Sequence, residues 1–260
     1  MILVDPDSEH LEMALRSGLN GQANQDLQSC LFFSSLPSTS DYLKQHHAQL
    51  PSWTLCFTRQ QTAGRGQAGR FWLSNQGDLT FSLLFRTREP RFLSRWPLQA
   101  AVIIAENLRE KGVPCGIKWP NDIMADNQKI GGILVETFCQ GTAFTAIIGI
   151  GINGISRDGK EPDQPWTALD RYGVVTDEPM PLMSDLLNAL IPEFEEPMQD
   201  LEKRWLGLDL AWKRQVTFEK DGKTFSGMGE GIDEAGRLKI LTSQGILYCH
   251  ASEVRLKWRR

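Results

Sequence analysis

The chain lacks any long apolar run: none of its 260 residues lies in a stretch of about 18 consecutive apolar side chains, the length that a membrane-spanning helix needs. Its first residues show no basic segment followed by an apolar core, which argues against a secretory signal. Basic residues are also fewer than acidic ones, with 28 Lys and Arg against 32 Asp and Glu. No overall basic field attracts nucleic acid or anionic lipid, so we expect a cytoplasmic protein without a DNA or membrane partner.

Cysteine and histidine are few and are not spaced for metal binding. The 5 cysteines contain no C-x-x-C pair, and the 4 histidines show no spacing typical of metal ligands. We therefore expect reduced, structural thiols and no catalytic histidine. The composition, with 41% hydrophobic and 23% charged residues, is that of an ordinary globular protein, and the length predicts one large domain or one large and one small.

Sequence patterns predict both helices and strands over most of the chain. Capping residues and terminal glycines place helices at 8–18, 38–49 and 94–112, the first of them isolated. Another helix pattern covers 184–205, with expected breaks at Pro192 and Pro197. The strand candidates are residues 53–61, 79–85, 129–138 and 143–153. After Trp212, short β-like runs between DG, EAG and SQG turns predict a small β-barrel.

The segment TAGRGQAGR, residues 62–70, has glycines at the spacing of a dinucleotide-binding turn. Such a turn needs a helix directly after the glycines and an acidic residue about 20 positions on. Here strand-like sequence follows, and Leu84 occupies that position relative to Gly64, so a Rossmann turn is excluded. Arg65 and Arg70 leave two interpretations open: a solvated basic loop, or a glycine-rich loop that folds over a phosphate or carboxylate.

Three further motifs bring polar groups to the ends of predicted strands. KWPND, residues 118–122, combines a cation, an aromatic ring, a proline and two polar side chains; its alternative reading is a strand-to-turn junction with a buried tryptophan. KIGGILVE begins at Lys129, and its two glycines allow close approach of a ligand or another backbone. Asn153 ends the strand IIGIGIN, where its amide either reads the edge of a base or closes a turn.

Taken in order, SLPSTSDYL, QQTAGRGQAGRFW, IKWPNDI, KIGGILVE and IGIGIN resemble the motifs of the biotin protein ligases, also called biotin acetyl-CoA-carboxylase ligases. The resemblance implies an α+β fold: a mixed β-sheet with packed helices, like class II aminoacyl-tRNA synthetases and biotin synthetases, plus a small C-terminal SH3-like β-barrel. It places an N-terminal extension at 1–30, the catalytic domain at 31–208 and the SH3-like domain at 212–260. The opening residues are too few and too acidic for a DNA-binding winged helix, so we expect the ligase-only type.

The resemblance also implies a two-step reaction that uses ATP, biotin and Mg²⁺. The biotin carboxylate attacks the α-phosphate of ATP to give biotinyl-5'-AMP and pyrophosphate, and a lysine of a biotin carboxyl carrier protein or carboxylase domain then takes the biotinyl group. Both steps gather negative charge in a small space, which explains why the motifs supply cations and backbone N–H groups and no protein nucleophile. The sequence leaves the oligomeric state open between a monomer and a homodimer.

Residue roles follow from the same resemblance. Lys129 and Arg65 are the expected catalytic cations, and Asp122 is the candidate magnesium ligand. The expected biotin-binding residues are Ser38, Thr39, Ser40, Gln61, Gly64, Arg65, Gly66, Gln67 and Lys129. The expected ATP- and adenylate-binding residues are Arg65, Arg70, Trp72, Asn121, Asp122, Lys129 and Asn153.

Two rival readings stay open. A lipoate-type ligase of the same superfamily also makes an acyl-adenylate, but lipoate has no ureido ring with which Ser38, Thr39 and Gln61 could pair. A non-catalytic regulator that binds biotin or its adenylate would keep the pocket, yet it would not need the cations Arg65 and Lys129 on the phosphate side.

Gln67 departs from the loop motif of the family. That loop usually reads G-R-G-R-x-G-R, and Gln67 replaces its second arginine. One guanidinium that would hold the adenylate phosphate is therefore missing. We expect the Gln67→Arg variant to release biotinyl-5'-AMP more slowly than the natural chain, as measured by following the intermediate in solution. Equal release rates would contradict this role.

Overall fold

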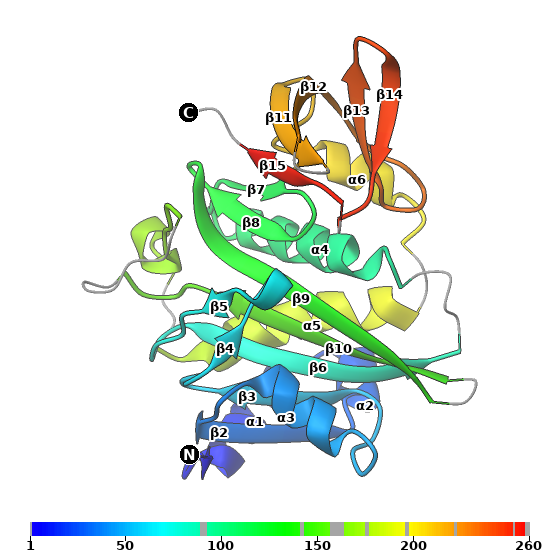
Figure 1. Cartoon of the computed structure of the whole chain (residues 1–260). Coiled ribbons are helices and arrows are strands. Elements are labelled where there is room, and N and C mark those ends of the chain that lie inside the picture. Colours follow the sequence, from blue (N-terminus) through cyan, green and yellow to red (C-terminus); the bar gives the residue numbers. More distant parts are fainter. Residues whose placement is uncertain are drawn as a thin grey trace.

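An eight-stranded sheet forms the centre of the molecule in a computed structural model, which describes residues 2–88, 93–140, 143–156, 164–174, 177–195, 198–220, 223–251 and 253–257 (Figure 1). The strand order is β1 (Leu3–Val4), β2 (Ser29–Ser35), β3 (Thr54–Thr58), β6 (Leu79–Thr87), β10 (Ala143–Ile152), β9 (Gln128–Gln140), β8 (Asp122–Ala125) and β7 (Cys115–Lys118). Among the described strands of this sheet, only β2 and β3 pair in parallel. The mixed sheet with packed helices confirms the predicted α+β class.

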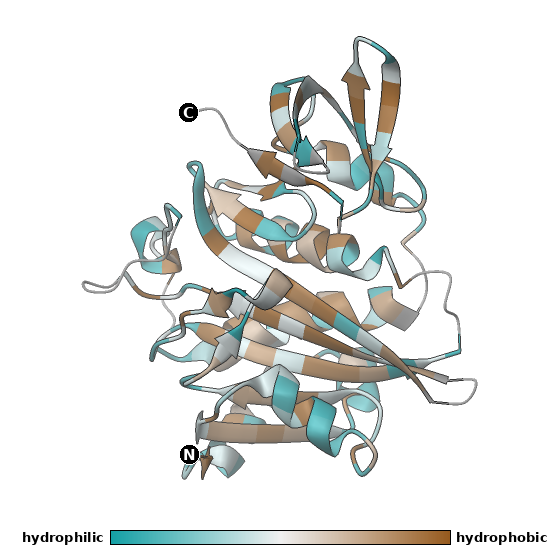
Figure 2. Ribbon diagram, in the orientation of Figure 1, coloured by the Kyte–Doolittle hydropathy of each residue, from teal (hydrophilic) through white to brown (hydrophobic). Residues whose placement is uncertain are grey.

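Side chains alternate between the two faces of the central strands, because successive residues of a strand point to opposite sides. Apolar residues of β6 and β10 enter the large core on one face, namely Leu79, Phe81, Leu83, Phe85, Ala146, Ile148, Ile150 and Ile152. The opposite face carries small or polar residues at one end, Thr80, Ser82, Gly149 and Gly151, before it becomes apolar again at Leu84 and Ile147. Figure 2 shows apolar and less apolar residues alternating along these strands.

Most helices cover the apolar face of the sheet. They are α1 (Ser8–Gly18), α2 (Gly21–Asp26), α4 (Trp96–Glu110) and α5 (Pro179–Glu195), whereas α6 (Leu201–Leu206) lies between α4 and β12 of the C-terminal sheet (Figure 1). The opposite face carries α3 (Thr39–His46), whose Leu43 joins a second, smaller core with Leu84 and Ile147. The short strands β4 (Gly64–Arg65) and β5 (Phe71–Trp72) also lie there, as a separate two-stranded sheet (Figure 1). None of the described helices is long and apolar enough to cross a membrane.

Two helix expectations need correction. The helix at 8–18 forms as predicted but is not isolated, since α2 follows it, and Asn188 of α5 accepts from Asn20 N at 2.7 Å and donates to Gly18 O at 2.9 Å. The break expected at Pro192 is wrong: α5 continues through it to Glu195, and buried Leu190, Ile191 and Phe194 keep its last turns on the sheet. Pro197 lies outside the described residues.

The C-terminal segment forms an open five-stranded sheet instead of the expected closed barrel. Its order is β14 (Gly245–Cys249), β13 (Leu238–Thr242), β12 (Lys223–Ile232), β11 (Gln215–Lys220) and β15 (Arg255–Lys257). Within the described residues β14 and β15 do not pair, and β15 extends β11 on the far side of the sheet. Phe218 and Ile240 of this sheet belong to the same core as α4 and α5.

Trp119 of the KWPND motif joins the central sheet to the C-terminal sheet. Its ring is buried, and its Nε1 donates to Gly236 O at 3.2 Å, in the turn between β12 and β13. The buried-tryptophan reading of the motif therefore describes Trp119, whereas its neighbours Asn121 and Asp122 belong to the site described below.

We expect Trp119→Phe to lower the free energy of unfolding by about 1 to 2 kcal/mol, because the Gly236 carbonyl stays buried without its donor. Urea unfolding measures the change. Trp212→Phe is the control, because it makes the same change at a half-buried tryptophan outside this contact. A Trp119→Phe variant as stable as this control would show that the bond contributes nothing.

Candidate active site

A cavity of about 530 Å³ opens on the face of the sheet that carries α3 and the β4–β5 loop. It is lined by every predicted site residue except Gly64 and Asp122: Ser38, Thr39, Ser40, Gln61, Arg65, Gly66, Gln67, Arg70, Trp72, Asn121, Lys129 and Asn153. Thus five motifs that are far apart in the sequence meet in one concave site. Its location follows from the strand alternation, since this is where the sheet presents its small and polar side chains.

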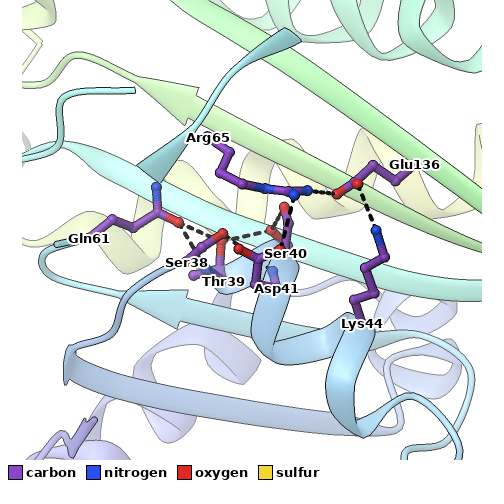
Figure 3. Close-up of polar contacts among 9 residues, drawn as sticks. Ser38, Thr39, Ser40, Asp41, Lys44, Gln61, Arg65 and Glu136 are labelled. Atoms are coloured by element: carbon purple, nitrogen blue, oxygen red, sulfur yellow. Dashed lines mark hydrogen bonds and ion pairs between the residues drawn. The ribbon is translucent and has the colours of Figure 1, made fainter. Parts of the chain in front are cut away.

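One end of the cavity is a buried cluster of hydroxyl and amide groups at the start of α3 (Figure 3). Ser38 caps the helix by accepting from Asp41 N at 3.3 Å. Gln61 Oε1 accepts from Thr39 N at 2.8 Å and from Thr39 Oγ1 at 3.2 Å. Ser82 of β6 bonds to Thr39 at 2.7 Å and to Ser40 at 2.9 Å. Such a cluster offers both donors and acceptors to a small polar group of a ligand.

Glycines form the floor of the cavity. Gly132 of β9 is paired with Gly151 of β10, and Gly149 lies two residues along on the same face. A Cβ at Gly151 would lie 2.5 Å from the Trp72 ring, and one at Gly149 would lie 2.6 Å from Ser40 Oγ. The glycines are therefore needed for close approach, because no larger side chain fits beneath Trp72 and α3.

Lys129 provides a nearly buried cation on this floor, with only 12% of its side chain exposed. Its Nζ forms an ion pair with Asp122, which β8 places opposite Gly132 of β9. The ammonium also lies 5.5 Å from the centroid of the Trp72 ring, within the range of a cation–π interaction. Asp122 itself is set back from the cavity, so it acts on the site through Lys129.

Arg65 provides the second cation, and it reaches across from β4 to the sheet and α3 (Figure 3). Its guanidinium pairs with Glu136 of β9 and lies 3.3 Å from Asp41 of α3, while Lys44 approaches Glu136 at 3.1 Å. The hydrogen bond to Glu136 raises the pKa of Arg65 above its ordinary value. Burial acts to raise the pKa of Glu136, but the hydrogen bonds from Arg65 and Lys44 outweigh it and leave that pKa lowered.

The loop between β4 and β5 is tightly folded. Gly66 N donates to Arg70 O at 2.7 Å, and Arg70 Nε donates to Gln67 O at 3.2 Å. Gly69 adopts a positive φ of 72°, a conformation that favours glycine. Arg70 is exposed at the rim, close enough to Lys118 that it helps lower the pKa of that lysine, after burial as the main cause. Positive charge therefore concentrates at this end of the cavity.

The side-chain amides of Asn121 and Asn153 donate hydrogen bonds to backbone carbonyl groups. Asn121 Nδ2 donates to Ile133 O at 2.5 Å. Asn153 Nδ2 donates to Thr167 O at 3.0 Å and to Lys129 O at 3.2 Å, so it fastens a later segment against β9. The role of Asn153 toward a nucleotide base stays a prediction.

Sequence reasoning missed several residues of the site. Glu136, Asp41 and Ser82 hold the predicted residues in place, and Trp166 lines the cavity beside Lys129. The strand period was a usable signal for one of them, because Glu136 lies on the same face of β9 as Gly132. No metal-type cluster of three or more His, Cys, Asp or Glu occurs among the described residues.

Comparisons with known proteins agree with this geometry. Residues 32–153 match the model of the Biotin/lipoate A/B protein ligase family, and residues 214–257 match that of the Biotin protein ligase C terminal domain. The chain is 34% identical over 221 residues to the bifunctional ligase/repressor BirA of Escherichia coli, covering 82% of this chain and 68% of that protein. It is 27% identical over 226 residues to the biotin acetyl-CoA-carboxylase ligase of Paracoccus denitrificans, covering 78% of this chain and 89% of that one.

Solved structures show the same likeness. The biotin protein ligase from Aquifex aeolicus in complex with biotin and ATP superposes with a TM-score of 0.74 at 27% identity, covering 88% of this chain and 99% of that chain. A mutant of that ligase in complex with biotin gives a TM-score of 0.75 at 27% identity, covering 89% of this chain and 99% of that chain.

The glycine floor generates a prediction. We expect Gly151→Ala to lower the free energy of unfolding by about 1 to 3 kcal/mol, because the methyl group must displace the Trp72 ring. Urea unfolding measures the loss. Gly21→Ala is the control, since a Cβ at Gly21 meets nothing within 4 Å. If both variants unfolded at the same denaturant concentration, the close approach of Trp72 to Gly151 would be wrong.

Proposed function

The chain belongs to the biotin protein ligase family, and from that premise we propose that its cavity joins biotin to ATP and passes the biotinyl group to a lysine of a carboxylase biotin-carrier domain. One observation carries the proposal. A single glycine floor connects a neutral cluster of hydroxyl and amide groups, beside which Arg65 lies, with the nearly buried cation Lys129, as a ligand with a polar ring and a carboxylate requires.

In the first step, a biotin carboxylate oxygen attacks the α-phosphorus of ATP, the new O–P bond forms, and pyrophosphate leaves. Negatively charged groups approach one another during this step, so fixed cations lower its barrier. We assign Lys129 and Arg65 to this task because both line the cavity and both are held in place by carboxylates. Their positions are set before substrate binds, which reduces the cost of ordering them.

In the second step, the carrier lysine amine attacks the acyl carbon of the mixed anhydride, a C–N bond forms and AMP leaves. The protein needs no nucleophile of its own. Its thiols are unsuited to that role, because burial raises the pKa of Cys115 and of Cys30 to about 12, and none of the five cysteines lines the cavity.

We assign the remaining residues by their position in the cavity. The ureido ring of biotin would pair with the cluster of Ser38, Thr39, Ser40 and Gln61 at the start of α3. The adenylate would lie beside Trp72, with its phosphate toward the Arg70 rim and the backbone of Gly64, Gly66 and Gln67. Asn121 and Asn153 would shape the nucleotide end through their bonds to the main chain.

Magnesium is part of the proposal as the ion that ATP brings. Asp122 is chemically suited to bind it, since carboxylate oxygens are typical Mg²⁺ ligands. The described residues offer no cluster of three such ligands, and Asp122 already pairs with Lys129. We therefore assign Asp122 first to the positioning of Lys129, with the phosphate oxygens of ATP and water as the main ligands of the ion.

The biotin reading is preferred over a lipoate-type ligase. The first family model includes both classes, but the second is specific to biotin protein ligases, as is the name of the Paracoccus denitrificans relative. We also propose that the reaction takes place in the cytoplasm, without DNA. Support comes from the net charge of -4 and from five free cysteines.

Biotin-dependent exchange of pyrophosphate into ATP tests the first step. We expect Lys129→Ala to lower the exchange rate by at least about 100-fold, because the charge that develops in the transition state loses its nearest buried cation. Thermal unfolding must accompany the assay, since Asp122 loses its partner in this variant. Lys213→Ala is the control, because Lys213 pairs with Glu230 far from the cavity in the C-terminal sheet.

Labelling of a biotin-carrier domain with biotin then tests the second step. Exchange without labelling would support a protein that only makes and keeps the adenylate. No exchange in the natural chain with biotin, ATP and magnesium would reject the ligase assignment, and normal exchange in a folded Lys129→Ala variant would reject the role of Lys129.

A further inference from the structure

Ser82 of β6 lies beneath the hydroxyl cluster at the start of α3, although it is not among the residues that line the cavity. Its Oγ lies 2.7 Å from Thr39 Oγ1 and 2.9 Å from Ser40 Oγ. Its neighbours on the adjacent strands are Cys56 and Gly149, whose side chains offer only a weakly bonding thiol. The two hydroxyl groups of α3 are therefore the strong hydrogen-bond partners of Ser82.

The protons of this cluster follow from one backbone group, which fixes its far end (Figure 3). Thr39 N can only donate, so the Gln61 atom that it meets at 2.8 Å is the amide oxygen. Thr39 Oγ1 lies 3.2 Å from the same oxygen and donates its single proton there, since two oxygens without a proton between them would repel each other. Ser82 must then donate to Thr39, and Ser40 must donate to Ser82.

This proton order gives the two ends of the cluster opposite character. The proton of Ser40 is already used, so its Oγ offers only lone pairs to the cavity, above the glycine floor at Gly149. The oxygen of Gln61 is already used, so its Nε2 offers N–H groups, and this nitrogen makes no hydrogen bond to the described residues. The cluster therefore presents an acceptor and a donor, as the N–H and C=O groups of a cyclic urea require.

We propose that Ser82 is a positioning residue that fixes Ser40 as a hydrogen-bond acceptor, and that Ser40 thereby selects a ligand with an N–H group at that point. The identity of this ligand, the ureido ring of biotin, rests on the proposed function, whereas the proton order does not. Ser82 acts through its bonds to Ser40 and Thr39, because it does not itself line the cavity.

Burial keeps water from replacing these hydrogen bonds. Thr39 is 2% exposed, Ser40 is 6% exposed and Ser82 is fully buried. A ligand acceptor placed against Ser40 would meet lone pairs without a proton, and neither group would find another partner. A site of this kind rejects a ligand that lacks the matching group far more strongly than an apolar pocket does.

Isothermal titration calorimetry tests the selection, with biotin and two cyclic carbamate analogues that each replace one ring N–H by oxygen. One analogue places its oxygen against Ser40, and we expect the natural chain to bind it at least about 30-fold more weakly than biotin. Ser82→Ala frees the proton of Ser40 to turn toward the ligand. That ratio of dissociation constants should therefore fall by about tenfold in the variant, while the ratio for the other analogue stays the same.

Ser184→Ala is the matched control. Ser184 of α5 is also buried and also makes two hydrogen bonds, to Met180 O at 2.7 Å and to Pro181 O at 3.1 Å, so its loss should lower stability without changing either ratio. Ser40→Ala removes the acceptor itself. The double variant with Ser82→Ala should show the same ratios as Ser40→Ala alone, since both changes act on one contact.

Neutron diffraction from the ligand-free protein tests the proton order directly, because it locates the deuterium atoms of the hydroxyl groups. We expect the deuterium of Ser40 to point to Ser82 and that of Ser82 to point to Thr39. The reverse order would overturn the proposal, as would equal affinity of the natural chain for biotin and both analogues, or unchanged ratios in a folded Ser82→Ala variant.

Two further outcomes are decided by the same measurements. If Ser82→Ala does not fold, Ser40→Ala takes its place, and a 30-fold ratio that survives this change would overturn the proposal. If the natural chain bound no biotin, the ligase function would fail, while the neutron map would still decide the proton order.

Discussion

The two-faced pleat of β6, β9 and β10 is the constraint on which the rest of the molecule depends. One face must be apolar because α4 and α5 cover it, and this requirement sets the large side chains at every second position. The intervening positions are then free to be small, and Gly132, Gly149 and Gly151 use that freedom to let the side chains of Lys129, Ser40 and Trp72 approach the sheet around the cavity. The cavity is thus a direct result of the same alternation that builds the core.

Two of the cations that line the cavity pair with carboxylates of the protein. Lys129 pairs with Asp122 and Arg65 pairs with Glu136, and in both pairs the carboxylate comes from a strand of the sheet. Such pairing lets positive groups stay in a partly dry site without a large penalty for their burial. It also lets a chain with a net charge of -4 keep a local site for anions.

Much of this organisation could be predicted from the sequence, because it is encoded locally. The helix at 94–112 has its start and stop signals in place, and Lys129 and Arg65 lie within short motifs. The partners of those cations could not be predicted with the same reasoning. Asp122 meets Lys129 across the hairpin of β8 and β9, only seven residues apart, and that pairing was not among the predicted strands. Glu136 meets Arg65 through loop packing between segments 71 residues apart. The helix break predicted at Pro192 is wrong for a related reason, because the tertiary packing of α5 outweighs the local effect of the proline.

The shared core of the two sheets has a consequence for how the molecule comes apart. Phe218 and Ile240 of the C-terminal sheet, Trp119 of the KWPND motif and the buried face of α4 form one continuous apolar cluster. A cluster of this kind couples its parts, so the loss of order in one sheet removes burial from the other. The C-terminal sheet is therefore a member of the same cooperative unit as the cavity, and heat should melt both in a single transition.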